Sequence, residues 1–361
     1  MIKEQIEDIL NEKKFSLRKI LKNEKYHFSQ GTIPLKELSE EKEPLLLGYI
    51  RQIIPEIIKK DIFTVSYDNS TLHKDWCNLV KKDVSGDIDV RSKSGNLILD
   101  MYMNHIYEVK NYKGISVKNS LTQEIWEKSL YISICRHHTP YKSEIRRNIS
   151  MALGVSSVTK YRAITAKKIC SEFGAKSVLD PCVGWGGRML GTICLDSKYV
   201  GFEPDIITFS KLQKVLEDDS IPRSCRKMAT IINKPFEIGV DDINETFDMI
   251  LTSPPYFNLE IYTSGIQSID SFSSWESWKD WLKSTILSCI AKLNPGGTSC
   301  WSVKNIKTDK KYPIADVTIS IHEEIGWKLV KIISLKGSSR DGKNVDTKES
   351  TYCFKKSTKF L

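Results

Sequence analysis

From residue 158 to residue 361, short apolar runs alternate with amphipathic segments. The apolar runs predict strands because they are rich in Val, Ile and Phe and end at Gly, Pro or Asp. The predicted strands are 177–179, 199–202, 229–232, 247–251, 298–303, 327–335 and 350–354. The predicted helices are 161–173, 188–194, 206–217, 275–293 and 313–325. This alternation predicts a doubly wound, mostly parallel α/β sheet whose final two strands form an antiparallel hairpin at its edge.

The first part of the chain has a different pattern. Residues 1–60 carry apolar positions at helical spacing among many charges. The alternating runs 62–67 and 96–102 predict strands, since Ser-Gly and Lys-Ser-Gly turns separate them. We therefore expect an N-terminal α+β accessory domain over residues 1–150, followed by the α/β sheet over residues 151–361.

A glycine-rich turn follows the first strand of the predicted sheet, in the sequence Asp180-Pro-Cys-Val-Gly184-Trp-Gly186-Gly187. Glycine adopts positive φ readily and lets the backbone approach a ligand that a Cβ would exclude. A strand, a glycine turn and a helix together form a cofactor site at the carboxyl edge of such a sheet. The glycines do not follow the Gly-x-Gly-x-x-Gly spacing and no P-loop lysine follows them, which indicates a cofactor without a pyrophosphate.

An acidic residue, Glu203, ends the second predicted strand. A carboxylate at this place can accept the protons of both ribose hydroxyls. Nicotinamide enzymes use the same feature, so Glu203 indicates a nucleotide-like cofactor without identifying it.

A second motif, Thr252-Ser253-Pro254-Pro255-Tyr256, follows the fourth predicted strand. Two successive prolines stiffen the backbone and donate no N–H, so the segment presents carbonyl acceptors. The Ser253 hydroxyl adds an acceptor and Tyr256 adds an aromatic face. Such a set suits a planar base with an exocyclic amine that has been taken out of its helix.

The two motifs together resemble those of the S-adenosylmethionine-dependent amino-methyltransferases, over residues 160–356. The resemblance implies the class I methyltransferase fold with a seven-stranded sheet and S-adenosyl-L-methionine as the cofactor. It also implies methyl transfer to N4 of cytosine or N6 of adenine, usually in DNA. Serine at the first position of the catalytic motif, as in Ser253, is more typical of the cytosine-N4 members, so that base is slightly favoured.

The resemblance also implies the roles of individual residues. The catalytic residues are expected to be Ser253, Pro254, Pro255 and Tyr256. The cofactor-binding residues are expected to be Asp180, Pro181, Cys182, Gly184, Gly186, Glu203, Glu237 and Thr252. The amine attacks the methyl group directly, so no cysteine nucleophile is required, and Cys182 is expected to pack rather than to react.

Position alone suggests further substrate contacts. The loops 257–274 and 336–349 are placed to border the base pocket, and we expect Phe257, Arg340 and Lys343, together with Tyr256, to bind the substrate. Neither between the two motifs nor after them is there room for a large target-recognition domain. The region 1–150 is therefore the expected target-recognition region.

The charge of the chain fits a polyanionic partner. The formal net charge is +9, and the basic excess lies in residues 101–160 and 261–361. The segment 136–147 is the densest basic and aromatic stretch, and it is a candidate nucleic-acid contact, most simply for double-stranded DNA. A lysine-rich surface and a solvated helix face explain the same pattern without a nucleic acid.

Composition excludes other classes. No apolar run reaches the roughly 18 residues of a membrane helix, and the charged first residues do not form a secretory signal. We expect a cytoplasmic protein, or one in the cytoplasm or nucleus of a host cell if the source is viral. The nine cysteines contain no Cys-x-x-Cys pair, so we expect free thiols and no metal site.

Alternatives remain at this point. An RNA base N-methyltransferase of the same fold would share the motifs, and a catalytically idle nucleic-acid-binding scaffold would share the fold. Protein-glutamine methyltransferases carry Asn at the position of Ser253, which argues against them. A cognate restriction nuclease is a candidate partner.

Overall fold

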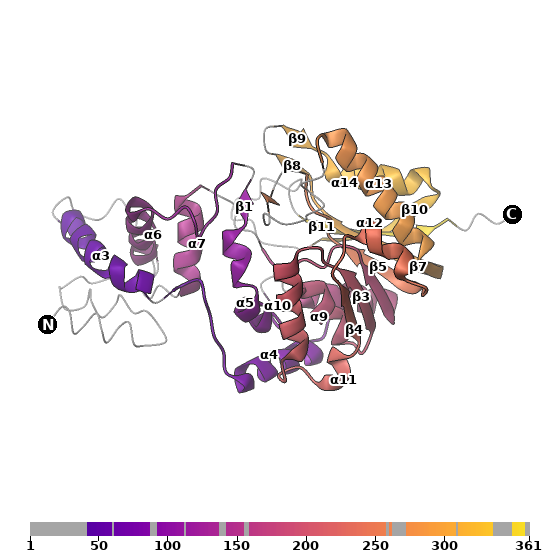
Figure 1. Ribbon diagram of the computed structural model, residues 1–361, viewed down its shortest axis with the longest axis horizontal. Helices are drawn as coiled ribbons and strands as arrows, with labels where there is room; N and C mark the ends of the chain where they lie inside the picture. Colours follow the sequence, from indigo (N-terminus) through magenta and orange to yellow (C-terminus); the bar gives the residue numbers. More distant parts are fainter. Residues whose placement is uncertain are drawn as a thin grey trace. The chain divides into compact units, whose positions relative to one another are not determined.

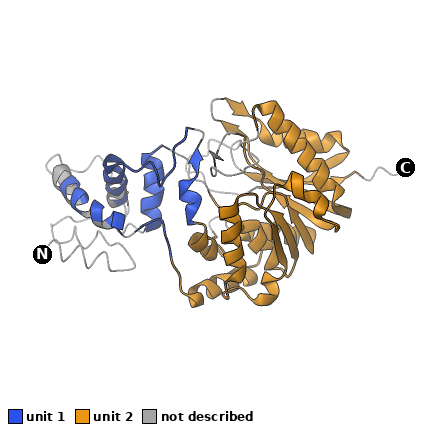
Figure 2. Cartoon of the chain, in the orientation of Figure 1, with its two compact units in different colours: residues 1–65, 104–158 blue, residues 66–103, 159–361 orange. Residues whose placement is uncertain are grey.

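The computed structural model divides the chain into two compact units (Figures 1 and 2). The first unit contains residues 1–65 and 104–158, and the second contains residues 66–103 and 159–361. The structure describes residues 42–59, 61–86, 92–111, 113–136, 142–154, 159–257, 260–261, 272–307, 310–334 and 349–357. The division therefore differs from the expected boundary after residue 150, because residues 66–103 lie with the second unit.

The described part of the first unit is mainly helical. Its elements are α3 (Lys42–Lys59), the 3-10 helix η1 (Asn104–Glu108), β1 (Lys110–Asn111), α6 (Gln123–Arg136) and α7 (Lys142–Ala152). Among the described residues of this unit, strand structure is limited to the two residues of β1, so the expected α+β character is mostly helical here. Buried side chains from the three α-helices share one core, which includes Ile50, Ile54, Trp126, Leu130, Ile145 and Ile149. Burial of such side chains from separate helices is what stabilises a small helical unit.

The two strands predicted between residues 61 and 103 are wrong. Residues 62–67 form a turn and irregular backbone. Asp61 has a φ of 40°, and its carboxylate accepts the Phe63 N–H at 3.2 Å, which turns the chain before a strand can start. Residues 97–102 form a helix, α5 (Leu97–Tyr102), whose first N–H is bound at 3.0 Å by the carboxylate of Asp75. That contact comes from a distant residue, so the local alternation could not reveal it.

The second unit is built on a seven-stranded sheet with the order β10-β11-β7-β5-β2-β3-β4 (Figure 1). The strands are β2 (Ser177–Asp180), β3 (Lys198–Phe202), β4 (Ala229–Ile232), β5 (Phe247–Thr252), β7 (Leu293–Val303), β10 (Trp327–Ser334) and β11 (Ser350–Lys356). Strands β4, β3, β2, β5 and β7 are parallel, and β11 runs antiparallel to both β7 and β10. This arrangement confirms the doubly wound seven-stranded sheet and its antiparallel terminal hairpin. In addition, β11 lies between β10 and β7 rather than at the edge.

Helices cover both faces of this sheet. They are α4 (Asn69–Lys81), α8 (Ala163–Phe173), α9 (Gly187–Ile193), α10 (Ile206–Glu217), α11 (Arg223–Arg226), α12 (Phe236–Gly239), α13 (Trp275–Ala291) and α14 (Ile314–Glu324), besides α5. Short elements complete the unit, namely η2 (Val240–Asp242), β6 (Glu260–Ile261), β8 (Ile306–Lys307) and β9 (Lys311–Tyr312). Adjacent residues of one strand enter different cores, as Val178 and Leu179 do, because strand side chains alternate between faces.

The first face packs against α4, α5, α8, α9, α10 and α11, and the second against α12, α13 and α14. Helix α4 is fixed at its C-terminal end by Lys167 of α8. The Lys167 ammonium donates to the carbonyls of Leu79, Val80 and Lys82 at 2.9, 2.7 and 2.7 Å. A cation at a helix C-terminus satisfies carbonyls that have no partner inside the helix. This contact explains why residues 66–103 belong to the sheet unit.

None of the helices in the described ranges combines the length and the apolar character needed to cross a membrane.

Candidate active site

The glycine turn lies between β2, which ends at Asp180, and α9, which begins at Gly187. Gly186 has a φ of 83°, in the left-handed region that favours glycine. A Cβ on Gly187 would lie 1.8 Å from the Tyr161 carbonyl oxygen, so only glycine lets α9 start this close to the segment before α8. The strand, turn and helix predicted from the sequence are therefore present, and the glycines are required by this geometry.

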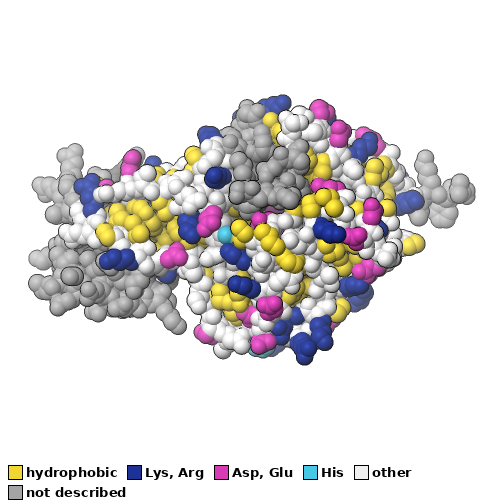
Figure 3. Space-filling view, in the orientation of Figure 1, with side chains coloured by type: hydrophobic (Ala, Val, Ile, Leu, Met, Phe, Trp, Pro, Cys, Tyr) yellow, Lys and Arg dark blue, Asp and Glu magenta, His cyan; other side chains and the backbone are white. Residues whose placement is uncertain are grey.

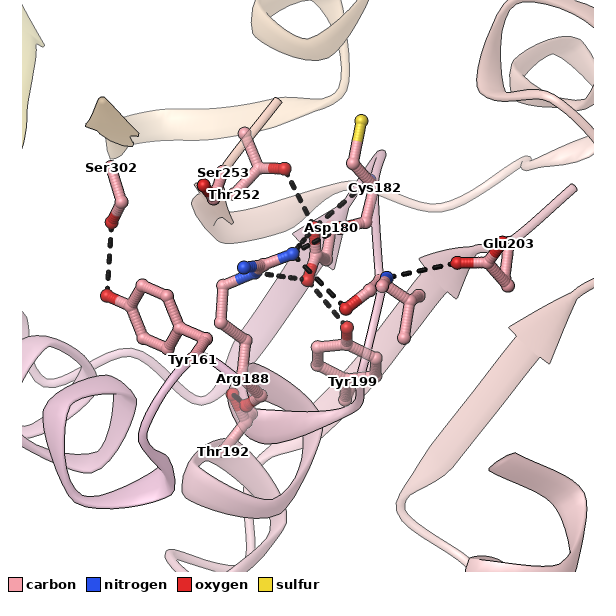
Figure 4. A network of polar contacts seen from close by, with 12 residues as sticks. Tyr161, Asp180, Cys182, Arg188, Thr192, Tyr199, Glu203, Thr252, Ser253 and Ser302 are labelled. Carbon is pink, nitrogen blue, oxygen red and sulfur yellow. Dashed lines mark hydrogen bonds and ion pairs between the residues drawn. The ribbon is translucent and has the colours of Figure 1, made fainter. Parts of the chain in front are cut away.

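Asp180 is the centre of a buried polar network beneath the turn (Figure 4). One of its carboxylate oxygens accepts from Arg188 Nε and from the Tyr199 hydroxyl, both at 2.7 Å. The other accepts from the Thr252 hydroxyl at 2.8 Å and the Cys182 N–H at 3.1 Å. A carboxylate has about four acceptor positions. Asp180 and Thr252, both expected to contact a cofactor, are thus engaged with protein groups and hold the turn in place.

Arg188 completes the network, and no pattern in the sequence had indicated its role. It forms a buried ion pair with Asp180, and its Nη2 donates to the carbonyls of Cys182 and, at 3.2 Å, Val183. Its guanidinium carbon lies 5.1 Å from the ring centroid of Tyr161. Burial disfavours the charged guanidinium, but Asp180, Tyr199 and Tyr161 together outweigh burial and raise the pKa of Arg188 above its ordinary value. The cation therefore fixes the path of the turn.

Glu203 lies beside the turn, just after the end of β3 (Figure 4). Its two carboxylate oxygens accept the N–H groups of Gly184 and Asp205, both at 3.0 Å. Burial raises the pKa of Glu203 to about 8. A carboxyl held so far above its ordinary range is typical of a functional site. The structure thus connects the predicted ribose-binding residue directly to the glycine turn.

Three predicted cofactor residues have less specific surroundings. Pro181 is buried and leads from Asp180 into the turn. Burial raises the pKa of the Cys182 thiol well above its ordinary value, so the thiol stays protonated and is a poor nucleophile. Glu237 is exposed on α12, which follows β4.

The catalytic motif follows β5 at the same edge of the sheet. Because β2 and β5 are adjacent and parallel, their carboxyl ends meet, and the bond between Thr252 and Asp180 joins the two motifs directly. The Ser253 and Tyr256 hydroxyls both donate to one oxygen of Glu349, at 3.3 Å each. Glu349 directly precedes β11. The expected meeting of the two motifs is therefore confirmed, and a carboxylate that sequence reasoning missed lies with them.

Other groups hold the proline pair and the tyrosine. The indole N–H of Trp278, on α13, donates to the Pro255 carbonyl at 3.1 Å. The Lys304 ammonium lies 5.4 Å from the ring centroid of Tyr256, which is only 9% exposed. The Pro255 carbonyl is thus engaged by Trp278. Pro254 links Ser253 to Pro255. Most of the Tyr256 ring is buried, which limits the face available for stacking.

Phe257, expected to bind substrate, packs in an aromatic cluster. Its ring centroid lies 5.7 Å from that of Trp275 and 5.1 Å from that of Tyr312. Arg340 and Lys343 lie outside the described residues, as do residues 258–259 and 262–271 of the loop after Phe257.

The basic segment 136–147 was a candidate nucleic-acid contact. In the structure, Arg146 donates to the Ile62 carbonyl and lies over the Tyr107 ring, with 5.4 Å between its guanidinium carbon and the ring centroid. Arg147 pairs with Glu144 at 2.8 Å. Residues 137–141 are outside the described ranges. These two arginines therefore have structural partners within the first unit.

Surface charge is mixed on the face of the second unit seen in the space-filling view, where Lys and Arg side chains are interspersed with Asp and Glu (Figure 3). Within the described ranges, no group of three or more His, Cys, Asp or Glu side chains is arranged to hold a metal ion.

The order and directions of the seven strands, with helices on both faces, are those of the class I methyltransferase fold, which the resemblance implied. Residues 247–361 match the model of the N6/N4 methyltransferase family, described as DNA methylase. This match confirms the resemblance to DNA amino-methyltransferases for that part of the chain, which contains the Thr252–Tyr256 motif. No curated protein is significantly similar to the chain.

Solved structures of similar fold include three methyltransferases of low sequence identity. The glycopeptide N-methyltransferase MtfA, complexed with sinefungin, is 11% identical (TM-score 0.40; 56% of this chain, 89% of that chain). A protein described as an rRNA methylase from Clostridium thermocellum is 12% identical (TM-score 0.39; 55% and 100%). The T. thermophilus 16S rRNA N2 G1207 methyltransferase RsmC, in complex with AdoMet and guanosine, is 18% identical (TM-score 0.34; 56% and 44%).

Proposed function

We propose that this chain transfers a methyl group from S-adenosylmethionine to an exocyclic amine of a DNA base, with N4 of cytosine favoured over N6 of adenine. The observation that carries the proposal is the hydrogen bond between Thr252 and Asp180, which places the two motifs together at the carboxyl edge of the sheet. The match of residues 247–361 to the DNA methylase family supports a nucleic-acid substrate.

The residues at this edge fit the proposed cofactor. Each Glu203 oxygen accepts one N–H from the described residues and so has capacity for a ribose hydroxyl. The nearest atom to a Cβ on Gly184 would be the Cys182 carbonyl oxygen, at 4.0 Å, so this part of the turn leaves room for a ligand. Ile206, at the start of α10, and Ile238, within α12, are 59% and 65% exposed and offer apolar surface for an adenine, beside Glu237.

The protein's part in the proposed reaction is mainly positioning. S-adenosylmethionine would supply a methyl group on a positively charged sulfur, which leaves as a neutral thioether. The Ser253 hydroxyl and the Pro254 carbonyl would hold the amine protons and so aim the nitrogen lone pair. Trp278 keeps the proline pair in place through the Pro255 carbonyl. Tyr256 would border the base, and Asp180 and Arg188 would act by holding the turn.

The remaining parts of the proposal concern the partner. Serine at position 253 favours cytosine over adenine through the family resemblance. Residues 1–150 are proposed to take part in target recognition, and Arg340 and Lys343 to contact the phosphates. A cognate restriction nuclease and a cytoplasmic location belong to the same proposal.

The test is methyl transfer from labelled S-adenosylmethionine to unmethylated double-stranded DNA, single-stranded DNA and RNA, followed by nucleoside mass spectrometry. We expect N4-methylcytosine in DNA. Detection of N6-methyladenine would show that adenine, not cytosine, is the target base. Label in RNA alone would show that the substrate is RNA and not DNA. No transfer to any of the three would contradict the proposal.

A matched pair of serine variants checks the assignment of the site. Ser253→Ala should lower kcat roughly 100-fold, because the amine loses one of its positioning acceptors. Ser320→Ala, at an exposed position of α14, should leave kcat unchanged. Equal activity of the two variants would remove Ser253 from the proposed machinery.

A further inference from the structure

A glutamate that belongs to neither motif lies against the proposed catalytic residues. One oxygen of Glu349 accepts from both the Ser253 and the Tyr256 hydroxyls, at 3.3 Å each. The sheet fixes this placement, because the next residue, Ser350, is paired with Val303 of β7, and β7 is the neighbour of β5. Glu349 is therefore held at the site by the backbone of β11 as well as by the two hydroxyls.

The contact determines the direction of the Ser253 hydrogen bond. A hydroxyl has one proton and two acceptor lone pairs. When Ser253 donates its proton to Glu349, both lone pairs remain for the N–H groups of a substrate amine. A carboxylate acceptor also makes this bond stronger than a bond between neutral groups.

We propose that Glu349 is the proton acceptor of the methyl transfer and that it acts through the Ser253 hydroxyl. This inference rests on the proposed function. The amine nitrogen forms a bond to the methyl carbon while the carbon–sulfur bond breaks, and its electron pair stays on sulfur. The nitrogen, now positively charged, gives one proton to the Ser253 oxygen. Ser253 in turn gives its own proton to the Glu349 carboxylate, which becomes a neutral carboxyl group.

Groups from three elements of the second unit surround the contact between Glu349 and the two hydroxyls. Tyr256 donates to it from the end of β5, and the Lys304 ammonium, from the end of β7, lies over the same tyrosine ring. Tyr161, from the segment before α8, also lies near Glu349. Its hydroxyl contacts Ser302 at 3.0 Å and Thr351 at 3.5 Å. The positive charge that develops on the amine adds a further attraction for a carboxylate.

The experiment compares Glu349→Gln with Glu349→Asp and with the control Glu323→Gln. Glutamine keeps an oxygen that accepts from both hydroxyls but is no base, so it removes proton acceptance alone. Glu323 is exposed on α14 and has no part in the site. Steady-state kinetics on the base identified above are measured from pH 5 to pH 9. Binding of S-adenosylhomocysteine and thermal unfolding are measured without turnover.

We expect kcat of Glu349→Gln to fall about 100-fold, within the usual range for loss of a general base. The rise of kcat with pH should disappear in this variant, whereas KM, S-adenosylhomocysteine binding and thermal unfolding should be unchanged. Aspartate should restore part of kcat and the rise with pH. Glu323→Gln should behave as the wild-type chain.

Two results would overturn the inference alone. One is a Glu349→Gln variant with wild-type kcat at every pH, and the other is a variant whose defect lies entirely in S-adenosylhomocysteine binding or in stability. Failure of the wild-type chain to methylate any nucleic acid would instead contradict the proposed function, and this inference with it.

Discussion

At the scale of single residues, the ion pair between Asp180 and Arg188 is the most enclosed charged contact of the site. The two side chains are 0% and 4% exposed. A buried pair is costly to break, because removal of one partner leaves the other charge without compensation. Arg188 also binds two carbonyls of the turn, so its loss would release the backbone that the glycines shape.

We predict that Arg188→Met lowers the free energy of unfolding by about 3–5 kcal/mol. Urea denaturation checks this value. The control is Lys198→Met, because Lys198 forms an exposed pair with Glu245 and should contribute less than about 1 kcal/mol. Equal losses in the two variants would show that the buried pair contributes no more to the free energy of unfolding than the exposed pair.

Residues next to a strand end could be predicted from the sequence, and residues brought in by strand pairing could not. The glycine turn, Glu203 and the Thr252–Tyr256 motif each adjoin an apolar run, so their shared edge followed from strand order. Glu349 reaches Ser253 because β11 inserts beside β7, a pairing between residues far apart in the chain. The sequence predicted Trp278 only as an apolar position of a helix and did not indicate its hydrogen bond to the Pro255 carbonyl.

At the scale of elements, α14 is attached to the sheet through a buried histidine. The His322 ring stacks on Phe354 of β11, with 3.8 Å between centroids. Its Nδ1 lies 2.8 Å from the Thr318 carbonyl and so carries the proton, while Nε2 lies 3.0 Å from the Ser299 hydroxyl. Both bonds suit the neutral ring, and burial lowers the pKa of His322 to about 4.

This pKa predicts a pH dependence of stability. The unfolded chain binds a proton at His322 near its ordinary value of about 6.5, whereas the folded chain does so only near pH 4. Stability should therefore be unaffected above about pH 6.5 and should fall as the pH drops towards 4, by roughly 3 kcal/mol in total.

Urea denaturation at several pH values between 7.5 and 4.5 measures this effect. His322→Gln should lose less stability over that interval than the wild-type chain. The control is His73→Gln, at an exposed position of α4. An identical pH slope in the wild-type chain and in His322→Gln would contradict the assignment.

The elements also show where local patterns mislead. The strands of the sheet were predicted correctly because alternating or continuous apolar runs were bounded by turn residues. Residues 96–102 show a similar alternation but form a helix, because Asp75 binds the first N–H and Ile98 and Leu99 enter the core beside α4. A contact between helices decided the outcome, and no single segment contains it.

At the scale of the whole molecule, the chain passes between the two units three times, after residues 65, 103 and 158. The chain thus first enters the sheet unit with residues 66–103, leaves it after residue 103 and enters it again at residue 159. The Lys160 ammonium lies 2.9 Å from the Asp100 carboxylate, and the Ala163 N–H donates to the Asn96 side chain at 3.3 Å. Within the second unit, the end of segment 66–103 and the start of segment 159–361 therefore lie close together.

We predict that residues 66–103 joined to residues 159–361 by a short Gly-Ser linker form a soluble unit that unfolds cooperatively. Residues 151–361 alone should aggregate, because they lack α4 and α5 and leave apolar core side chains such as Leu212 uncovered. Size-exclusion chromatography and thermal unfolding distinguish the two chains. A soluble 151–361 chain with the same unfolding temperature would contradict this prediction.

Because the ribosome synthesises the chain from its N-terminus, the order of the segments determines when each becomes available for folding. Helices α4 and α5 emerge before residues 163–251, which supply the surfaces that cover them. At about 5–20 residues per second, Leu72, Trp76 and Leu99 wait on the order of ten seconds for their partners. During that interval the nascent chain exposes these apolar side chains, and their core is complete only after β7, β10 and β11 have been synthesised.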